Sequence, residues 1–299
     1  TDEKLTFADT EVHLLDGSVT GDGRVENWRK APLRVEATAS GIIGAKMMEW
    51  ASRQTEIPPQ YMLRSPLEVA AGRVRWRDDG DFSFNGKLTI AHGPRLSIDM
   101  ARNLGSLTLN DLLIDDAGQS ARAKFERAQD KWGGAFSGTL NKQTLDRIFL
   151  TAPVQLGLLQ GDFAVNVFSK PPYRLSARGT LAGKDIVSPL KGEDAAIEQF
   201  IVQGDPAGLN IRSADLRWRR SHLAVSGKLA AAQDALQVDM DVGADRLVWE
   251  EINAIITGDG QKEQGNEQFT VPVVKGVIRL KTERLDVGAW SWNPLGVTA

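Results

Sequence analysis

The stretch VRWRDDGDFSFNGKLTIAHGPRLSIDM, residues Val74–Met100, returns later in the chain as LRWRRSHLAVSGKLAAAQDALQVDM, residues Leu216–Met240. The two copies share a tryptophan, a glycine followed by Lys-Leu, and a closing Asp-Met. In both copies apolar and polar residues alternate, as Leu96, Ile98 and Met100 do with the polar residues between them. Alternation with a period of two places the apolar side chains on one face of a strand. It predicts antiparallel strands with the other face in water.

The same alternation recurs along the chain and is interrupted at short intervals by turn signals. Clear examples cover residues 82–90, 223–229 and 236–242. Glycine-containing turn signals, such as Asp79-Gly80 and Gly133-Gly134, separate the alternating runs. The sequence therefore predicts a mainly β fold, a repetitive and curved antiparallel sheet with a few short helices.

A glycine inside an alternating run marks a looser repeat. These glycines are Gly41, Gly86, Gly138, Gly179, Gly227 and Gly276. Their spacing indicates repeats of about 40–50 residues, each with several short strands. We therefore expect one elongated strand-rich region over residues 1–299, with possible halves at 1–150 and 151–299, stacked as a quasi-one-dimensional array. The alternative is a single duplicated sandwich domain.

Three short segments have a helical pattern instead. Residues 42–55 place apolar side chains on a 3.6-residue stripe ahead of Pro58-Pro59. Residues 141–150 begin with Asn141, a residue typical of helix N-caps, and residues 248–256 form the third segment. Helices this short are marginal in water, so we expect them to pack on the sheet or to plug its end.

Composition excludes several classes of site. The chain has 299 residues, a net charge of −3, no cysteine and three histidines. It cannot form disulfides or thiolate metal sites, and it lacks the basic charge typical of nucleic-acid binding. No metal site, cofactor motif or catalytic motif is recognised, so we expect neither an enzyme nor a cofactor. The chain begins Thr-Asp-Glu-Lys and has no long apolar segment, so we expect a fragment or mature form of a larger protein.

Two weaker patterns each allow two interpretations. Arg73, Arg75 and Arg77 alternate along one strand and could bind phosphate groups, or they could form a solvated face paired with carboxylates of neighbouring strands. The segment Asp16–Glu26 has several oxygen-bearing side chains but not the spacing of a calcium loop, which favours a turn.

Several segments resemble the C-terminal region of AsmA-like proteins. They are MMEWASRQTEIPPQYMLRSPLEVAAGRVRW, AFSGTLNKQTLDRIF, SADLRWRRSHLAVSGKLAA and VKGVIRLKTERLDVGAWSWNPL. The resemblance covers most of the chain from about residue 33 onward. It implies a periplasmic, strand-rich region, groove- or taco-shaped, tethered to the inner membrane by a segment absent from this chain. It also implies a role in carrying phospholipid toward the outer membrane, and thus in outer-membrane lipid homeostasis and biogenesis.

The apolar strand face permits such a function, because a sheet without a second layer exposes a surface that acyl chains could cover. The residues that we expect to face lipid are Phe84, Leu96, Ile98 and Met100 in the first copy, and Val225, Leu236, Val238 and Met240 in the second. The expected partner is a phospholipid or another acyl-chain lipid. Two alternatives stay open: a scaffold that binds other envelope proteins without conducting lipid, and a carbohydrate-active enzyme with a carboxylate pair.

Overall fold

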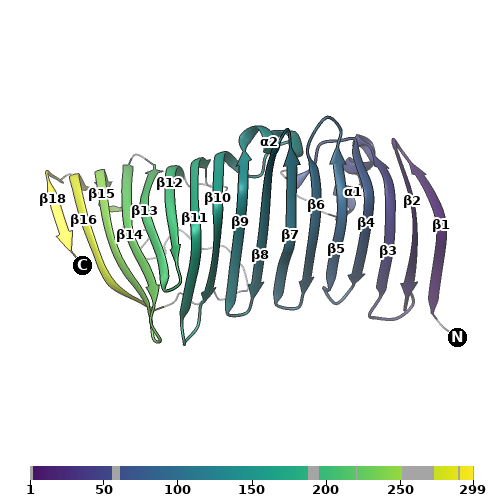
Figure 1. The fold of residues 1–299 in the computed structure, drawn as a ribbon, viewed down its shortest axis with the longest axis horizontal. Coiled ribbons are helices and arrows are strands. Elements are labelled where there is room, and N and C mark those ends of the chain that lie inside the picture. The colour runs from purple at the N-terminus through teal and green to yellow at the C-terminus, as the bar shows by residue number, and fades with distance from the viewer. Residues whose placement is uncertain are drawn as a thin grey trace. The chain divides into compact units, whose positions relative to one another are not determined.

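A computed structural model describes residues 3–55, 61–187, 195–219, 221–250, 273–288 and 290–298. Strands account for 73% of the chain, which confirms the prediction of a mainly β fold built from curved antiparallel sheet. The chain divides into two compact units, Thr1–Pro153 (unit 1) and Val154–Ala299 (unit 2), and Figure 1 shows the strands of each.

Unit 1 is an antiparallel meander in which each strand pairs with the next one in sequence. Its strands are β1 (Lys4–Leu14), β2 (Gly17–Glu26), β3 (Arg34–Ile43), β4 (Leu67–Arg77), β5 (Phe82–Ile90), β6 (Arg95–Asn103), β7 (Ser106–Asp116), β8 (Gln119–Ala128) and β9 (Lys131–Asn141). Helix α1 (Ala45–Thr55) follows β3, and helix α2 (Lys142–Ile148) follows β9. Because consecutive strands alternate in direction, the strand ends and their turns lie along two sides of the sheet. One of these sides adjoins α2 (Figure 1).

The helices cover one end of the sheet of unit 1. Ile148 of α2 belongs to a buried cluster with Leu67, Ile90 and Leu96, and Met48 of α1 packs against the same cluster. Both helices therefore lie on the same face of the sheet. Alternation explains the location of this core, because every second residue of the strands points to this face.

Polar contacts hold α2 in this position. The side chain of Asn141 accepts a hydrogen bond from the Thr144 backbone N–H at 2.9 Å, which confirms the predicted N-cap. Asp116, at the end of β7, is only 6% exposed. It accepts a hydrogen bond from the Thr144 hydroxyl at 2.9 Å and forms an ion pair with Arg147 at 2.7 Å. The helix is thus attached to the sheet by a buried carboxylate, whose loss would leave Thr144 and Arg147 without this partner.

Unit 2 continues the same kind of meander until its last strands. Its strands are β10 (Gln155–Phe168), β11 (Arg174–Val187), β12 (Ala195–Asp205), β13 (Gly208–Trp218), β14 (Ser221–Ala231), β15 (Leu236–Val248), β16 (Val274–Val287), β17 (Trp290–Trp292) and β18 (Leu295–Thr298). Strands β10 to β15 pair antiparallel in sequence order, β15 and β16 pair in parallel, and β16 then pairs with both β17 and β18.

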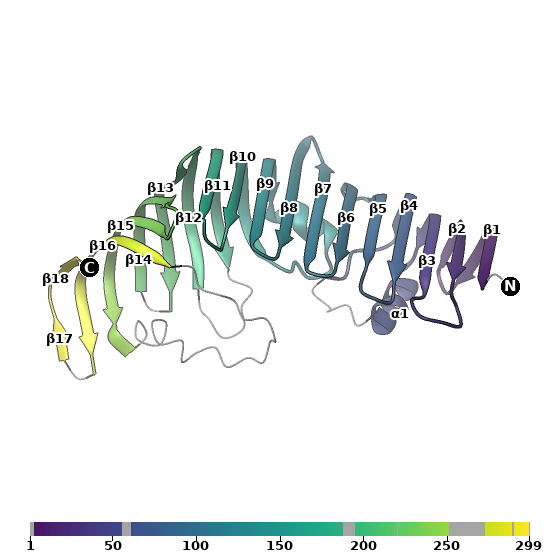
Figure 2. The same ribbon diagram turned by 90° about the horizontal axis from the view of Figure 1, so that it is seen from below.

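The sheet of unit 2 curls strongly at one end, as the view in Figure 2 shows. The backbone N–H of Tyr173, just before β11, donates to the carbonyl of Gln233, just after β14, at 3.3 Å. Its hydroxyl accepts a hydrogen bond from the Val273 N–H at 3.2 Å. In a flat sheet, strands three positions apart lie about 14 Å from each other. The Tyr173 contacts therefore require the sheet to roll over at this end.

The repeat glycines have an unusual backbone conformation. Of the six, all except Gly86 have positive φ angles, from 81° at Gly179 to 151° at Gly276. Register shifts also interrupt several pairings, including β4–β5 next to Gly86 and β13–β14 next to Gly227. Bulges and glycines of this kind increase twist and bending, which accounts for the curvature of the sheets.

The first two predicted helices correspond to α1, which begins at Ala45 rather than at residue 42, and to α2. The third, 248–256, lies mostly outside the described residues. In the part of the chain that the structure describes, no helix has the length and apolar character needed to span a bilayer.

Candidate functional site

Unit 1 has one continuous apolar face, which we define by rows of side chains that pair across β4 to β9. The middle row consists of Val74, Phe84, Met100, Leu109, Phe125 and Gly134. The next row toward the helices consists of Gly72, Gly86, Ile98, Leu112, Ala123 and Phe136. Directly paired residues point to the same side of a sheet, so each row runs across the sheet on this face, called here the apolar face of unit 1.

This face changes in character along the strands. At the helix-covered end, Leu96 is 5% exposed and lies inside the buried cluster. At the opposite end, which we call the open end, Trp76 is 39% exposed and Trp132 is 44% exposed. The sheet therefore has a sealed core at one end and exposed apolar side chains at the other, within one face.

The predicted lipid-facing residues of the first copy occupy different depths of this gradient. Leu96 lies under α2, Phe84 and Ile98 are half-buried and pack against the core cluster, and Met100 is half-buried in the middle row. They all lie on one face, and the assignment of that face to lipid stays a prediction.

The predicted residues of the second copy also share one face, in unit 2. Leu236, Val238 and Met240 lie on β15 and pair with Ala231, Leu229 and Gly227 of β14. Val225 lies on the same side of β14, two residues before Gly227. Val225, Leu236, Val238 and Met240 are all half-buried.

The opposite face of unit 1 is polar and internally paired. The Arg75 guanidinium lies 3.5 Å from the Glu36 carboxylate, which also forms an ion pair with the Arg24 guanidinium at 2.8 Å. Hydrogen bonding by the Arg122 guanidinium holds the pKa of the Asp111 carboxyl below its ordinary value. Arg77, the last residue of β4, pairs with Asp79 and Asp81 of the turn that follows. For Arg75 and Arg77, these contacts support the interpretation as a solvated, carboxylate-paired strand face.

The segment Asp16–Glu26 forms a turn and a strand rather than a cation loop. The Asp16 carboxylate accepts hydrogen bonds from the backbone N–H groups of Lys46 and Met47, both at 3.0 Å. It thereby caps α1 from a neighbouring hairpin, and these bonds, that from Lys46 first, lower its pKa. Among the described residues, no group of His, Asp or Glu side chains has a metal-binding arrangement.

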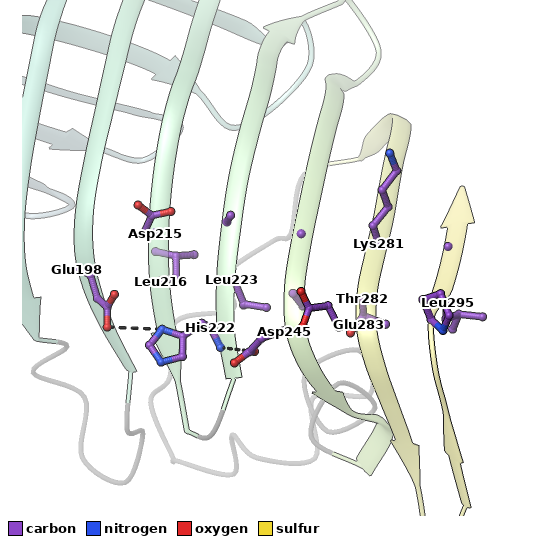
Figure 3. Close-up of a pocket in the computed structure, with 15 residues that line it drawn as sticks. Glu198, Asp215, Leu216, His222, Leu223, Asp245, Lys281, Thr282, Glu283 and Leu295 are labelled. Carbon is purple, nitrogen blue, oxygen red and sulfur yellow. Dashed lines mark hydrogen bonds and ion pairs between the residues drawn. The ribbon is translucent and has the colours of Figure 1, made fainter.

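A shallow hollow of about 720 Å³ lies along β12 to β18 of unit 2 (Figure 3). Its lining includes the carboxylates of Glu198, Asp215, Asp245 and Glu283, and the first three have partners inside the protein. Asp245 accepts a hydrogen bond from the His222 backbone N–H at 2.8 Å, and Asp215 accepts one from Gln199 at 2.6 Å. The His222 ring lies 3.6 Å from the Glu198 carboxylate. Because three of these carboxylates already have partners and the hollow is open, it provides a weaker candidate than the apolar faces.

Some residues of the apolar face of unit 1 do not follow from the alternation pattern of the sequence. Leu109 and Leu112 both point to it, although their spacing of three breaks the period of two. The cause is a bulge at Asn110, where β7 has one residue more than β6. The available signal was a change of phase inside Ser106–Asp116, with Leu107 and Leu109 in one phase and Leu112 and Ile114 in the other.

Comparisons with known proteins give no neighbour for this arrangement: no protein-family model matches the chain, and neither a curated protein nor a solved structure matches it.

Proposed function

We propose that this chain is a periplasmic lipid-binding module that takes part in phospholipid transport and in outer-membrane lipid homeostasis. The observation that carries the proposal is the apolar face of unit 1, where large side chains such as Trp76, Leu107 and Trp132 are exposed at the open end. Soluble proteins rarely expose such contiguous apolar surface without a ligand or partner. The resemblance of the sequence to AsmA-like proteins supports the same proposal.

An acyl chain suits this surface for two physical reasons. The middle row has no charged side chain across its strands, so a hydrocarbon chain would not have to desolvate an ion. Each methylene group removed from water contributes about 0.8 kcal/mol. Transfer along such a face needs no catalytic group, because the lipid only exchanges one apolar environment for another.

Photo-crosslinking at adjacent positions tests the proposal. Met100 and Ala101 are consecutive on β6 and point to opposite faces of the sheet. A benzophenone amino acid at Met100 should crosslink to copurifying phospholipid, and the same group at Ala101 should not. Val225 and Ala224 on β14 form the matched pair in unit 2.

The outcomes separate the competing functions. Lipid adducts at Met100 and Val225, with none at the control positions, support a lipid-binding face. Protein adducts in place of lipid adducts favour the scaffold, and equal lipid labelling at all four positions would contradict a specific face.

A further inference from the structure

The open end of the apolar face of unit 1 carries a cationic row that neither the composition nor the repeat pattern singles out. This row, called here the rim row, pairs continuously across β4 to β9. Its members are Trp76, Phe82, Arg102, Leu107, Arg127 and Trp132. It adjoins the middle row directly, two residues away along each of the six strands.

The arginines of the rim row lie on the apolar face rather than on the polar one. Arg102 pairs with Phe82 and Leu107, and Arg127 pairs with Leu107 and Trp132. Both arginines are exposed, and Arg127 also interacts with another group of the protein. Since they occupy β6 and β8, with β7 between them, their backbones lie about 10 Å apart. Side chains of this length can converge on one anion between them.

The rim row itself contains no carboxylate; Asp130, which also interacts with another group of the protein, lies in the adjoining β8–β9 turn. The adjoining β4–β5 turn contains Asp79 and Asp81, but these bind Arg77, with Asp81 at 3.0 Å from its guanidinium. The rim row therefore combines cations with aromatic rings, and the rows behind it are apolar. From the open end toward the helices, the face therefore presents cationic and aromatic side chains, then uncharged apolar side chains, and then the sealed core.

We propose that the rim row binds the phosphate headgroup of a phospholipid whose acyl chains lie on the middle row. This inference rests on the proposed function, to which it adds the orientation of the lipid and the residues that recognise its charge. Arginine suits phosphate because its planar guanidinium donates several hydrogen bonds to phosphate oxygens. Tryptophan is suited to the boundary between headgroup and hydrocarbon, because its ring is apolar and its N–H is polar.

A pair of lipid probes with identical acyl chains tests this proposal on the full chain. One probe is a fluorescent phosphatidylglycerol, and the other is the corresponding diacylglycerol, which lacks the phosphate. The double variant Arg102→Gln/Arg127→Gln should weaken binding of phosphatidylglycerol by about tenfold or more, the scale of a lost hydrogen bond to a charged group. Binding of the diacylglycerol should stay within about twofold, because the apolar contacts are unchanged.

Arg75→Gln is the matched control. Arg75 lies near the same end of the sheet but points to the polar face. Its substitution removes one positive charge, as each of the single variants Arg102→Gln and Arg127→Gln does, so it is compared with these two. We expect it to alter neither affinity. If Arg75→Gln weakens phosphatidylglycerol binding as much as a single rim-row variant does, the arginines act by general electrostatic attraction, and the proposal is overturned.

The remaining outcomes separate this proposal from the proposed function. If the double variant loses both probes equally, or neither, the rim row does not recognise phosphate, and lipid binding by the apolar face still stands. If the unmodified chain binds neither probe, the proposed function itself fails. If inorganic phosphate alone displaces phosphatidylglycerol at comparable concentration, the rim row is an anion site independent of acyl chains, which also overturns the proposal.

Discussion

The two copies of the repeated stretch have similar sequences but different surroundings. In unit 1, Leu96 packs in a sealed cluster with Ile148 of α2 and is 5% exposed. Its counterpart in unit 2, Leu236, is half-buried. The alternation that places both side chains on an apolar face is the same, so the burial of each is decided by what covers the face. A strand pattern therefore predicts sidedness, whereas the depth of burial depends on residues far away in sequence.

The largest expected effect separates the two copies directly. Leu96→Asp should destabilise unit 1 by about 4 kcal/mol or more, because the carboxylate would lie in a sealed core without a partner. Leu236→Asp should cost about 1–2 kcal/mol, because its environment remains partly hydrated. Urea unfolding followed by tryptophan fluorescence measures both. Equal losses of stability would show that the second copy is sealed as well.

A smaller difference is expected at the repeat glycines. A Cβ at Gly227 would lie 2.2 Å from the Asp239 carbonyl oxygen, and its φ is 147°, which side chains rarely adopt. At Gly86 the nearest atom is the end of the Phe84 ring, at 2.6 Å, which can rotate away. Gly227→Val should therefore destabilise by about 3 kcal/mol and Gly86→Val by about 1 kcal/mol. Thermal melting of both variants measures the two losses of stability. A larger loss for Gly86→Val than for Gly227→Val would contradict the argument that the atoms around each glycine set the cost of a side chain there.

The smallest expected effect is a local loss of stability at β15 and β16 in acid. Hydrogen bonds, from Arg284 first and also from Ser291 and Arg246, lower the pKa of Asp286 in β16 to about 2, from an ordinary 3.8. Because the folded-state pKa is depressed, this contribution to stability is present above the ordinary pKa and is lost as the pH falls toward 2. Pulse-labelled hydrogen exchange should show β15 and β16 opening in this window before β5 and β6.

Asp286→Asn provides the control for this acid effect. It removes the titrating group, so the opening of β15 and β16 should become nearly independent of pH between 4 and 2. If the opening keeps its full pH dependence in this variant, other carboxylates cause the effect. One of these is Asp241, whose pKa is lowered mainly by the hydrogen bond from Arg279.

Much of the fold follows from short-range pattern. The alternating runs around residues 82–100 and 223–242 correspond to strands, and the Asn141 cap marks the start of α2. The apolar face follows from the same pattern. The cover of that face does not, because the contacts of Asp116 with Thr144 and Arg147 join residues about thirty positions apart. The rim row was missed for a related reason: Arg102 and Arg127 come together only when the register of three strands is known.

The order of strand pairing has a consequence for how the chain folds. From β1 to β9, and from β10 to β15, each strand pairs with the one that follows it, across a turn or a short connection in most cases. Such a topology has a low contact order, and loop closure at each step is entropically cheap. Each unit can therefore grow strand by strand, with every new hairpin pairing with the last strand already in place. The parallel pairing of β15 with β16 is the exception, because the chain must first cross from Val248 to Val274, and this closure is expected to be the slowest step in unit 2.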